Sequence, residues 1–422
     1  MNRRQYLSQF LALFTGTVLA QLFNLGSYPL LSRLYGPADF GLFGTFVAAA
    51  AIPGAIACGR FELAIAITPE AGRRSMLWLC YSIALGVALA ATCVVSIYWW
   101  RVATPDLGIL APLLFAAVFL TGVVNSTTMY LMRHESFRFA SSGVVTRTAT
   151  AVLTQIGLAF IWRSPLGLIA GFCLGLAAQA CLAVYAANRA HPLGRPERVG
   201  MTEMFRRFRP QVSVDLPGSM LATLSFNLIP FALQALYGIR AVGFFSLGQR
   251  LAVLPLQLFN DSLSQVFFQR AARAQEERGE FWQEYRFTLI CAGLISMVML
   301  AGLLIFAKPV TVFYLGPRWA LAGTILVILA PMLAMRSVAM SLATSVFVLR
   351  RPAWLLFLNM ASVMAIVVTF GVTRFNGANL LGFMKMLAIL QGAEYAIFAL
   401  LVGTAVYRAS RRSERVVAEP QG

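Results

Sequence analysis

Nine ionisable side chains lie inside long apolar segments of this 422-residue chain. An ionisable group inside a segment of membrane-spanning length is costly there, so each one is a candidate for function. Arginine suits an anionic ligand because its planar fork of donors matches phosphate oxygens bidentately, and a carboxylate can take up a proton or a sodium ion. The basic groups are Arg60, Arg147, Arg250, Arg336 and Lys385, and the acidic groups are Glu62, Asp215, Asp261 and Glu394. We interpret the five basic groups as candidate ligands of an anionic head group, and Asp261 and Glu62 as candidate ion-coupling groups.

Arg250 is the strongest candidate because it lies about midway along its apolar segment, too deep to reach either interface easily. The alternative for Arg250, and for the similarly deep Arg336, is a buried ion pair with an acid on another helix. Arg60 is nearer a segment end, from which its side chain could extend to the interface. Glu62 is then a protonatable group or the partner of Arg250. Residues two apart on a helix point to different faces, so we predict that Arg60 and Glu62 do not pair with each other.

The other ionisable groups have simpler structural interpretations. Arg147 is two turns into its segment and can also extend to the interface. Lys385 and Glu394 are too far apart along one helix to pair directly. Asp261 either binds a proton or sodium ion or is hydrogen-bonded within the helix bundle. Asp215 begins its segment, which predicts a helix cap or a partner of the helix dipole.

The composition indicates a membrane protein. The chain is 59% hydrophobic and only 12% charged, with a mean hydropathy of +0.75, whereas soluble domains carry about 25% charged residues. Apolar segments of about 20 residues recur throughout, which predicts a polytopic helical membrane protein. The six cysteines lie in such segments without a CxxC pair. They are typical of small core residues and indicate no disulfide framework or metal site.

Twelve membrane-spanning helices are predicted, and the first is interpreted as an uncleaved span rather than a signal peptide. Their approximate ranges are 7–32, 41–67, 75–100, 107–132, 139–162, 165–188, 211–236, 241–269, 286–314, 319–349, 352–373 and 380–407. The longest loops are expected near 189–210 and 270–285. Basic residues alternate between the loops of the two sides in a ratio of 22 to 7, with five more inside spans. By the positive-inside rule both termini are therefore expected to be cytoplasmic, and the net charge of +18 reflects topology rather than nucleic-acid binding.

A repeat divides the chain into halves. Residues 34–43 and 236–245 share five identities of ten at an offset of 202, and the loop near 189–210 separates six spans from six. An even number of spans per half predicts a parallel repeat around an axis along the membrane normal, with a central cleft that opens alternately to each side. We expect bundles over 1–200 and 201–408 and a basic cytoplasmic tail over 409–422. Within the repeat frame, Asn260-Asp261-Ser262 matches Cys58-Gly59-Arg60 and predicts polar groups at one depth in both halves.

Four motifs carry a resemblance to a known family. Residues 32–41, Ser-Arg-Leu-Tyr-Gly-Pro-Ala-Asp-Phe-Gly, resemble the first-loop motif of bacterial polysaccharide-export and O-antigen flippases. Residues 59–65 resemble the second-span motif of that family, residues 265–271 its eighth-span exit, and residues 314–319 its turn before the tenth span. These flippases belong to the multidrug/oligosaccharidyl-lipid/polysaccharide exporter (MOP) superfamily, and the four motifs occur in the order that the family shows.

The resemblance implies an all-α, V-shaped, MATE-like transporter of two pseudo-symmetric six-helix bundles. It implies the flipping of an undecaprenyl-diphosphate-linked oligosaccharide across the inner membrane of a Gram-negative cell for O-antigen, capsule or exopolysaccharide. Its expected partners are this substrate, membrane lipids and other membrane proteins of polysaccharide assembly, with no nucleic acid.

Two other functions remain open from the sequence. A cation-coupled drug antiporter of the same superfamily should have fewer cations in its cavity. A membrane-embedded glycan polymerase or ligase would need a large extracytoplasmic loop that is not predicted. His134 and His191 lack metal-ligand spacing and no Walker A motif occurs, so no enzyme activity, cofactor or metal is expected.

Overall fold

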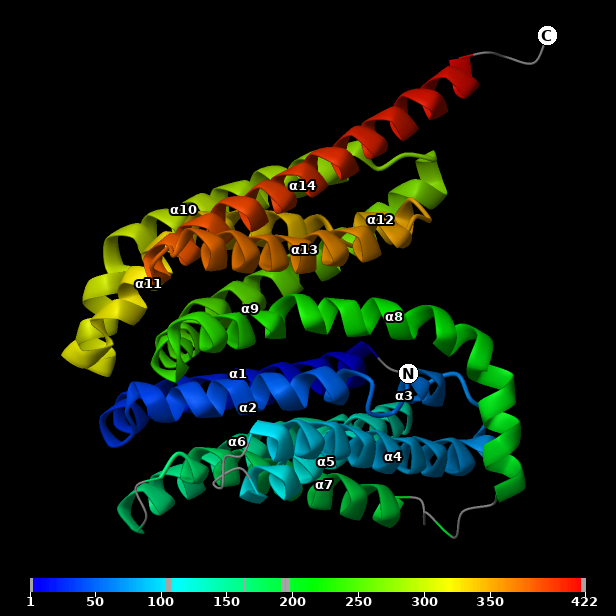
Figure 1. The fold of residues 1–422 in the computed structure, drawn as a ribbon. Coiled ribbons are helices and arrows are strands. Elements are labelled where there is room, and N and C mark those ends of the chain that lie inside the picture. Colours follow the sequence, from blue (N-terminus) through cyan, green and yellow to red (C-terminus); the bar gives the residue numbers. More distant parts are fainter. Residues whose placement is uncertain (1–2, 103–107, 162–163, 191–193, 195–197, 419–422) are drawn as a thin grey trace. The chain divides into compact units, whose positions relative to one another are not determined.

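The computed structural model describes residues 3–102, 108–161, 164–190, 194 and 198–418, and these residues are helical apart from short connections. The helices are α1 Arg3–Leu34, α2 Pro37–Ala55, α3 Phe61–Ile65, α4 Glu70–Val102, α5 Leu110–Arg133, α6 Phe137–Ile161, α7 Leu166–Ala190, α8 Arg198–Tyr237, α9 Ile239–Arg278, α10 Trp282–Leu315, η2 Pro317–Trp319, α11 Ala320–Leu342, α12 Ser345–Val348, α13 Ala353–Asn376 and α14 Leu380–Ala418 (Figure 1). The prediction of an all-helical membrane protein is confirmed.

Each of the twelve predicted spans coincides with a long helix or with a pair of successive helices. Ten of the described stretches are long and apolar enough to cross a membrane. The other two ranges are covered by α1 and α9, which are 32 and 40 residues long. The span predicted over 41–67 is not continuous, because α2 ends at Ala55 and α3 begins at Phe61.

The chain forms two compact units, residues 1–227 and 228–422, and the boundary lies inside α8. The predicted loop near 189–210 is partly helical, since α8 begins at Arg198. Met204, Phe208 and Val212 of α8 are buried in the core of the first unit, together with residues of α3, α4, α5 and α7. The apolar face of this segment is therefore covered by the first unit, which is why it continues as helix. The predicted loop near 270–285 is reduced to a short turn in the same way, because α9 extends to Arg278 and α10 begins at Trp282.

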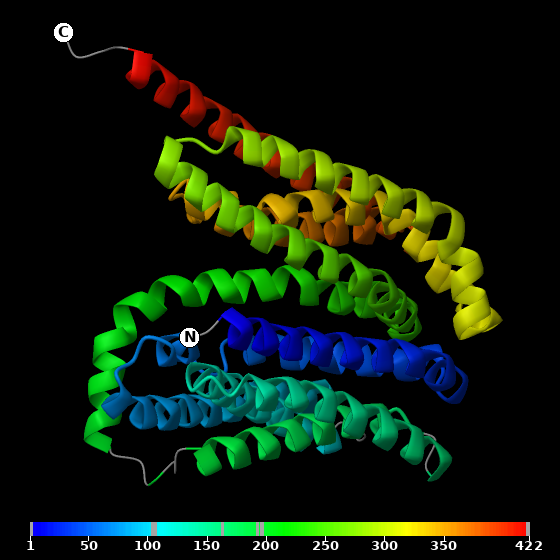
Figure 2. The same cartoon turned by 180° about the vertical axis from the view of Figure 1, so that it is seen from behind.

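The helix α8 is bent in both views of the molecule (Figures 1 and 2). It contains Pro210, Pro217 and Pro230, and proline is the usual cause of sharp helix bends. Asp215 lies far inside this helix and is exposed. The prediction that Asp215 caps a helix is therefore wrong, because the helix starts 17 residues earlier than the apolar pattern indicated.

Glycines on α7 allow this helix to pack closely against α6 in the first unit. A Cβ atom on Gly175 would lie 2.5 Å from the Arg147 carbonyl oxygen, and one on Gly171 would lie 2.8 Å from the Ala151 carbonyl oxygen. With Gly167 these glycines are four residues apart, the spacing that lets two membrane helices approach. The buried Gln155 side chain ties the pair further, since its Nε2 donates to the Leu168 carbonyl at 2.9 Å.

The second unit is built around α11, which packs against α10, α14 and α9. Its core is a single cluster of buried apolar residues contributed by all of its long helices. Trp319 is fully buried where α11 begins and meets the ring of Phe244 edge-on at 5.8 Å. Tyr285 of α10 donates a hydrogen bond to the Ala399 carbonyl of α14 at 2.9 Å. These contacts fix α10 and α14 around α11.

The repeated Leu-Tyr-Gly segment has the same role in both halves. Gly36 and Gly238 are the N-cap residues of α2 and α9, so the two helix starts keep the offset of 202. The Tyr35 hydroxyl donates to the Gln155 carbonyl at 2.8 Å, and the Tyr237 hydroxyl donates to the Ala378 carbonyl at 2.8 Å. Burial, reinforced by Asp39, raises the pKa of Tyr35 to about 12, so the phenol stays neutral. The two N-cap glycines differ in backbone conformation, since Gly238 has a φ of 80° and Gly36 a φ of −86°.

Candidate functional site

The best candidate site in the first unit is the interruption between α2 and α3. Residues 56–60 form turns instead of helix. Gly59 and Arg60 both have left-handed backbone, with φ of 57° and 66°. This conformation costs a non-glycine residue roughly 1–2 kcal/mol. Such strain persists only where the surroundings impose it, and it is concentrated at functional sites. Interrupted helices inside a membrane protein are also typical of ligand sites.

The interruption brings Arg60 and Glu62 together. The Arg60 Nη1 atom lies 3.5 Å from Glu62 Oε1. The prediction that these residues do not pair is therefore wrong, because it assumed a continuous helix and Arg60 is not helical. Nor is the ion pair complete: Arg60 Nε and Glu62 Oε2 are buried and have no hydrogen-bond partner among the described residues. A buried polar network left partly unsatisfied is costly, so this pair is suited to receive a further polar ligand.

Helices on three sides hold this ion pair in place. Glu62 is 7% exposed, and its carboxylate lies near Cys80 of α4. The thiol of Cys58, in the interruption, donates to the Gly122 carbonyl of α5 at 3.2 Å. From α8, the ring of Phe205 stacks on Phe61 with 5.4 Å between ring centroids. The Arg60 side chain, by contrast, remains 29% exposed. The carboxylate is thus enclosed while the guanidinium is accessible.

Arg147 lies on α6 and packs on an aromatic ring of α7. Its guanidinium carbon is 5.4 Å from the centroid of the Phe172 ring on α7. Phe172 meets Phe43 and Phe46 of α2 edge-on at 6.1 and 6.5 Å. A cation over an aromatic face is stabilised by the ring quadrupole. The contact favours the structural interpretation of Arg147, with aromatic packing as the stabilising interaction.

The structure places Arg250 and Asp261 on the uninterrupted helix α9. Arg250 is partly buried and Asp261 is exposed. The neighbouring Asn260 is the residue that packs inward, since its Oδ1 accepts hydrogen bonds from the Ser337 and Ser341 hydroxyls of α11 at 2.6 and 3.3 Å. Within the polar triplet 260–262, Asn260 therefore connects α9 to α11, and Asp261 is exposed.

Arg336 belongs to a buried polar cluster that the sequence did not indicate. It lies near the phenol of Tyr395 on α14, which also interacts with Glu394. The Ser362 hydroxyl of α13 donates to Glu394 Oε1. Glu394 Oε2 is buried and lacks a hydrogen-bond partner among the described residues. Three helices thus meet in one region, with Arg336 from α11, Ser362 from α13, and Glu394 and Tyr395 from α14. This arrangement adds Glu394 to the candidate ion-coupling groups.

Lys385 lies apart from this cluster. It is exposed on α14, nine residues before Glu394. The seven predicted site residues are therefore distributed over several places within the two units. Among them, Arg60 and Glu62 are in direct contact.

Comparison with known proteins assigns the chain to a family. The family model described as "Polysaccharide biosynthesis protein" matches residues 30–324. The chain belongs to this family. No curated protein matches it significantly.

Solved structures of membrane transporters share the fold. A structure described as "Lipid II flippase MurJ, inward closed conformation" has a TM-score of 0.72 at 13% identity, over 97% of this chain and 93% of the other. An inward-facing MATE-family multidrug resistance transporter of the MOP superfamily has a TM-score of 0.69 at 16% identity, over 93% and 96%. A MOP superfamily transporter from Pyrococcus furiosus has 0.63 at 16% identity, over 94% of each chain. The expected MATE-like fold is confirmed, and the family match agrees with the resemblance to polysaccharide-export proteins.

Proposed function

We propose that this chain flips an oligosaccharide linked to undecaprenyl diphosphate across the bacterial inner membrane for surface polysaccharide assembly. Three observations support the proposal: membership of a polysaccharide biosynthesis family, a fold shared with a lipid II flippase, and cationic groups inside membrane-spanning helices. The diphosphate head group carries negative charge that needs cationic ligands during its passage. Arginine supplies these ligands with matched geometry.

The observation that carries the proposal is Arg60 at the interruption between α2 and α3. Its guanidinium uses one nitrogen toward Glu62, and its buried Nε has no acceptor among the residues described. A phosphate group would supply acceptor oxygens for Nε and for the second terminal nitrogen at once. In this proposal the left-handed backbone of Arg60 has a function, because it holds the guanidinium beside Glu62 where the phosphate would bind.

Glu62 gives this contact a means of coupling. A phosphate bound at Nε and the second terminal nitrogen would add negative charge beside Glu62 and would share the Arg60 guanidinium that neutralises this carboxylate. A buried carboxylate that is not fully neutralised is unfavourable, so Glu62 would then bind a proton. Release of the head group would restore the ion pair and expel the proton. Arg250 is proposed as a second head-group ligand, and Asp261 as a second ion-coupling candidate. Arg147, Arg336 and Lys385 are proposed as further, weaker head-group candidates.

Substitutions at Arg60 separate its charge from its backbone strain. Glycine adopts a left-handed backbone without penalty, so Arg60→Gly should fold normally and abolish surface polysaccharide. Arg60→Lys keeps the charge but loses the fork, and should retain partial function. Likewise, Arg250→Ala should abolish surface polysaccharide, and Arg250→Lys should retain partial function. Arg133→Gln is the control, because Arg133 is exposed at the end of α5.

The measurement is polysaccharide at the surface of a deletion strain at matched protein level, together with flipping of a fluorescent lipid-linked oligosaccharide in proteoliposomes. Wild-type activity of Arg60→Gly and Arg250→Ala in both assays would refute the head-group role. Resistance to cationic dyes without flipping would instead indicate the drug antiporter.

A further inference from the structure

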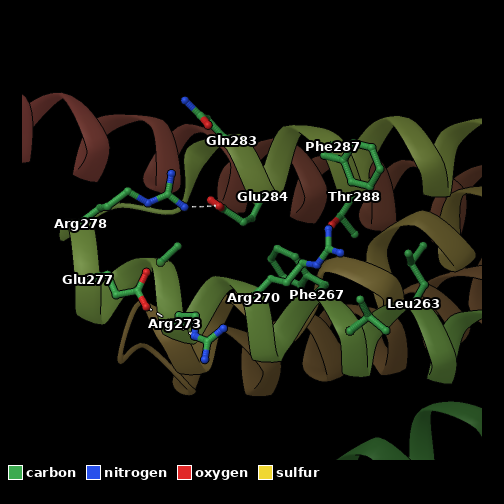
Figure 3. Close-up of a pocket in the computed structure, with 12 residues that line it drawn as sticks. Leu263, Phe267, Arg270, Arg273, Glu277, Arg278, Gln283, Glu284, Phe287 and Thr288 are labelled. Atoms are coloured by element: carbon green, nitrogen blue, oxygen red, sulfur yellow. Dashed lines mark hydrogen bonds and ion pairs between the residues drawn. The ribbon is translucent and has the colours of Figure 1, made fainter.

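A further polar site lies in the second unit, at the end of α9 and the start of α10. It is a cavity of about 290 Å³ between the two helices (Figure 3). Phe267 forms part of its wall and is fully buried against Phe281 and Tyr285, with ring centroids 6.5 and 6.4 Å apart. The wall is thus fixed by aromatic packing, and the cavity is built into the helix pair.

One cation of this cavity is uncompensated. Arg273 pairs with Glu277 at 3.5 Å, and Arg278 pairs with Glu284. These pairs balance the charge of both carboxylates that line the cavity, although Glu284 Oε2 is buried without a hydrogen-bond partner among the described residues. Arg270 makes no hydrogen bond or ion pair with the residues that the structure describes. Figure 3 shows its side chain directed across the cavity toward Thr288, a buried residue of α10. An anion placed there would find the Arg270 guanidinium and the Thr288 hydroxyl as donors.

One side of the cavity is apolar, which indicates a ligand with a hydrophobic tail. Leu263, Val266 and Phe287 line it, and Val266 and Phe287 are more than half exposed. From Phe287 an exposed apolar stripe continues along α10 through Ile290, Leu294 and Met297. This helix has a mean hydropathy of 2.7 over its membrane window. The charged groups of the cavity could therefore bind the head group of a lipid. The exposed apolar stripe that leads away from them could contact its acyl chain.

We propose that this cavity binds the phosphate of an anionic glycerophospholipid, with Arg270 as its charged ligand and the stripe on α10 in contact with an acyl chain. The cavity volume of about 290 Å³ lies just below the usual range for small-molecule sites, which runs from about 300 to 1,000 Å³. It has room for a phosphate head group and none for a lipid-linked oligosaccharide. The site is therefore distinct from the transport site proposed above, and its ligand is a lipid of the surrounding bilayer.

The test is native mass spectrometry of the full-length protein titrated with dioleoyl phosphatidylglycerol and, separately, with dioleoyl phosphatidylethanolamine. The wild type should retain the anionic lipid preferentially. Arg270→Gln should weaken its binding by about tenfold, as expected for loss of a charge-assisted hydrogen bond. Val266→Trp, which fills the cavity without changing charge, should weaken it similarly. Arg286→Gln removes an exposed arginine near the start of α10 that does not line the cavity, and this variant should bind lipid as the wild type does.

Each other outcome overturns the proposal. Equal losses in Arg270→Gln and Arg286→Gln would mean general electrostatic attraction of lipid to a basic surface. Displacement of the lipid by excess inorganic phosphate would mean a site for free anions. Unchanged binding in Arg270→Gln, with the variant monodisperse and its thermal transition preserved, would mean that the cavity is not used.

Discussion

The glycines of α7 provide a prediction whose sign can be worked from the structure. In Gly175→Ala the new Cβ would lie 2.5 Å from the Arg147 carbonyl oxygen and 2.9 Å from the Ala151 Cβ. Real Cβ atoms do not approach a backbone carbonyl so closely, so α6 and α7 must separate. Overpacking of this kind costs about 1–3 kcal/mol. The helix itself favours alanine by roughly 0.5–1 kcal/mol, which leaves a net loss of up to about 2.5 kcal/mol.

The matched control is on the facing helix. Gly157 of α6 has no atom within 4 Å of the position of an added Cβ, so Gly157→Ala keeps only the gain in helix propensity. We expect Gly175→Ala to be less stable than the wild type and Gly157→Ala to be equal or more stable. The difference is measured by reversible unfolding in mixed micelles with increasing dodecyl sulfate, followed by far-ultraviolet circular dichroism. Equal stability of the two variants would refute the conclusion that close backbone packing determines this interface.

Two further predictions concern the turn after α1 and the orientation of the chain. A Cβ on Gly167 would lie 2.5 Å from the Tyr35 hydroxyl oxygen. Gly167→Ala should therefore lower the free energy of unfolding of the wild type but lower it little further in a Tyr35→Phe background. Additive losses in this double-mutant cycle would contradict the contact. The 22-to-7 distribution of basic residues predicts cytoplasmic termini, so a fluorescent protein fused after residue 422 should fluoresce, and alkaline phosphatase fused after residue 377 should be active. The reverse pattern of reporter activity would show that the positive-inside assignment is wrong.

Much of the scaffold could be predicted because it depends on apolar length and on turn chemistry. The Leu-Tyr-Gly repeat located the starts of α2 and α9 at the same offset of 202. Apolar length located the helices but could not show that polar segments next to them are also helical. The start of α8 is helical because Met204 and Phe208 pack on the first unit, a tertiary contact with no local signal.

The candidate site was harder to predict for a related reason. Apolar patterning continues through residues 41–67 and does not indicate that Arg60 leaves the helical conformation. The rule that residues two apart do not pair then gave the wrong result for Arg60 and Glu62. A local signal does exist for the α6–α7 contact, since glycines at 167, 171 and 175 repeat every four residues, which is typical of closely packed membrane helices. The cluster around Glu394 required the positions of three helices and had no such signal.

The two halves keep a common scaffold but differ where the chemistry is expected. The repeat aligns residues 58–60 of the interruption with residues 260–262, yet α9 is continuous through them. Asn260 explains the difference in part, because its hydrogen bonds to Ser337 and Ser341 hold this turn of α9 against α11. In the first unit the equivalent position holds Cys58, whose thiol makes a weaker bond to the Gly122 carbonyl. Gly59 and Arg60, both left-handed, follow it. A parallel repeat conserves helix starts and packing without conserving polar contacts, so the strained cation at Arg60 is a property of one half. If the head group is bound as proposed, Arg60 and Arg250 cannot be equivalent ligands, and the loss of function in their lysine variants should differ in extent.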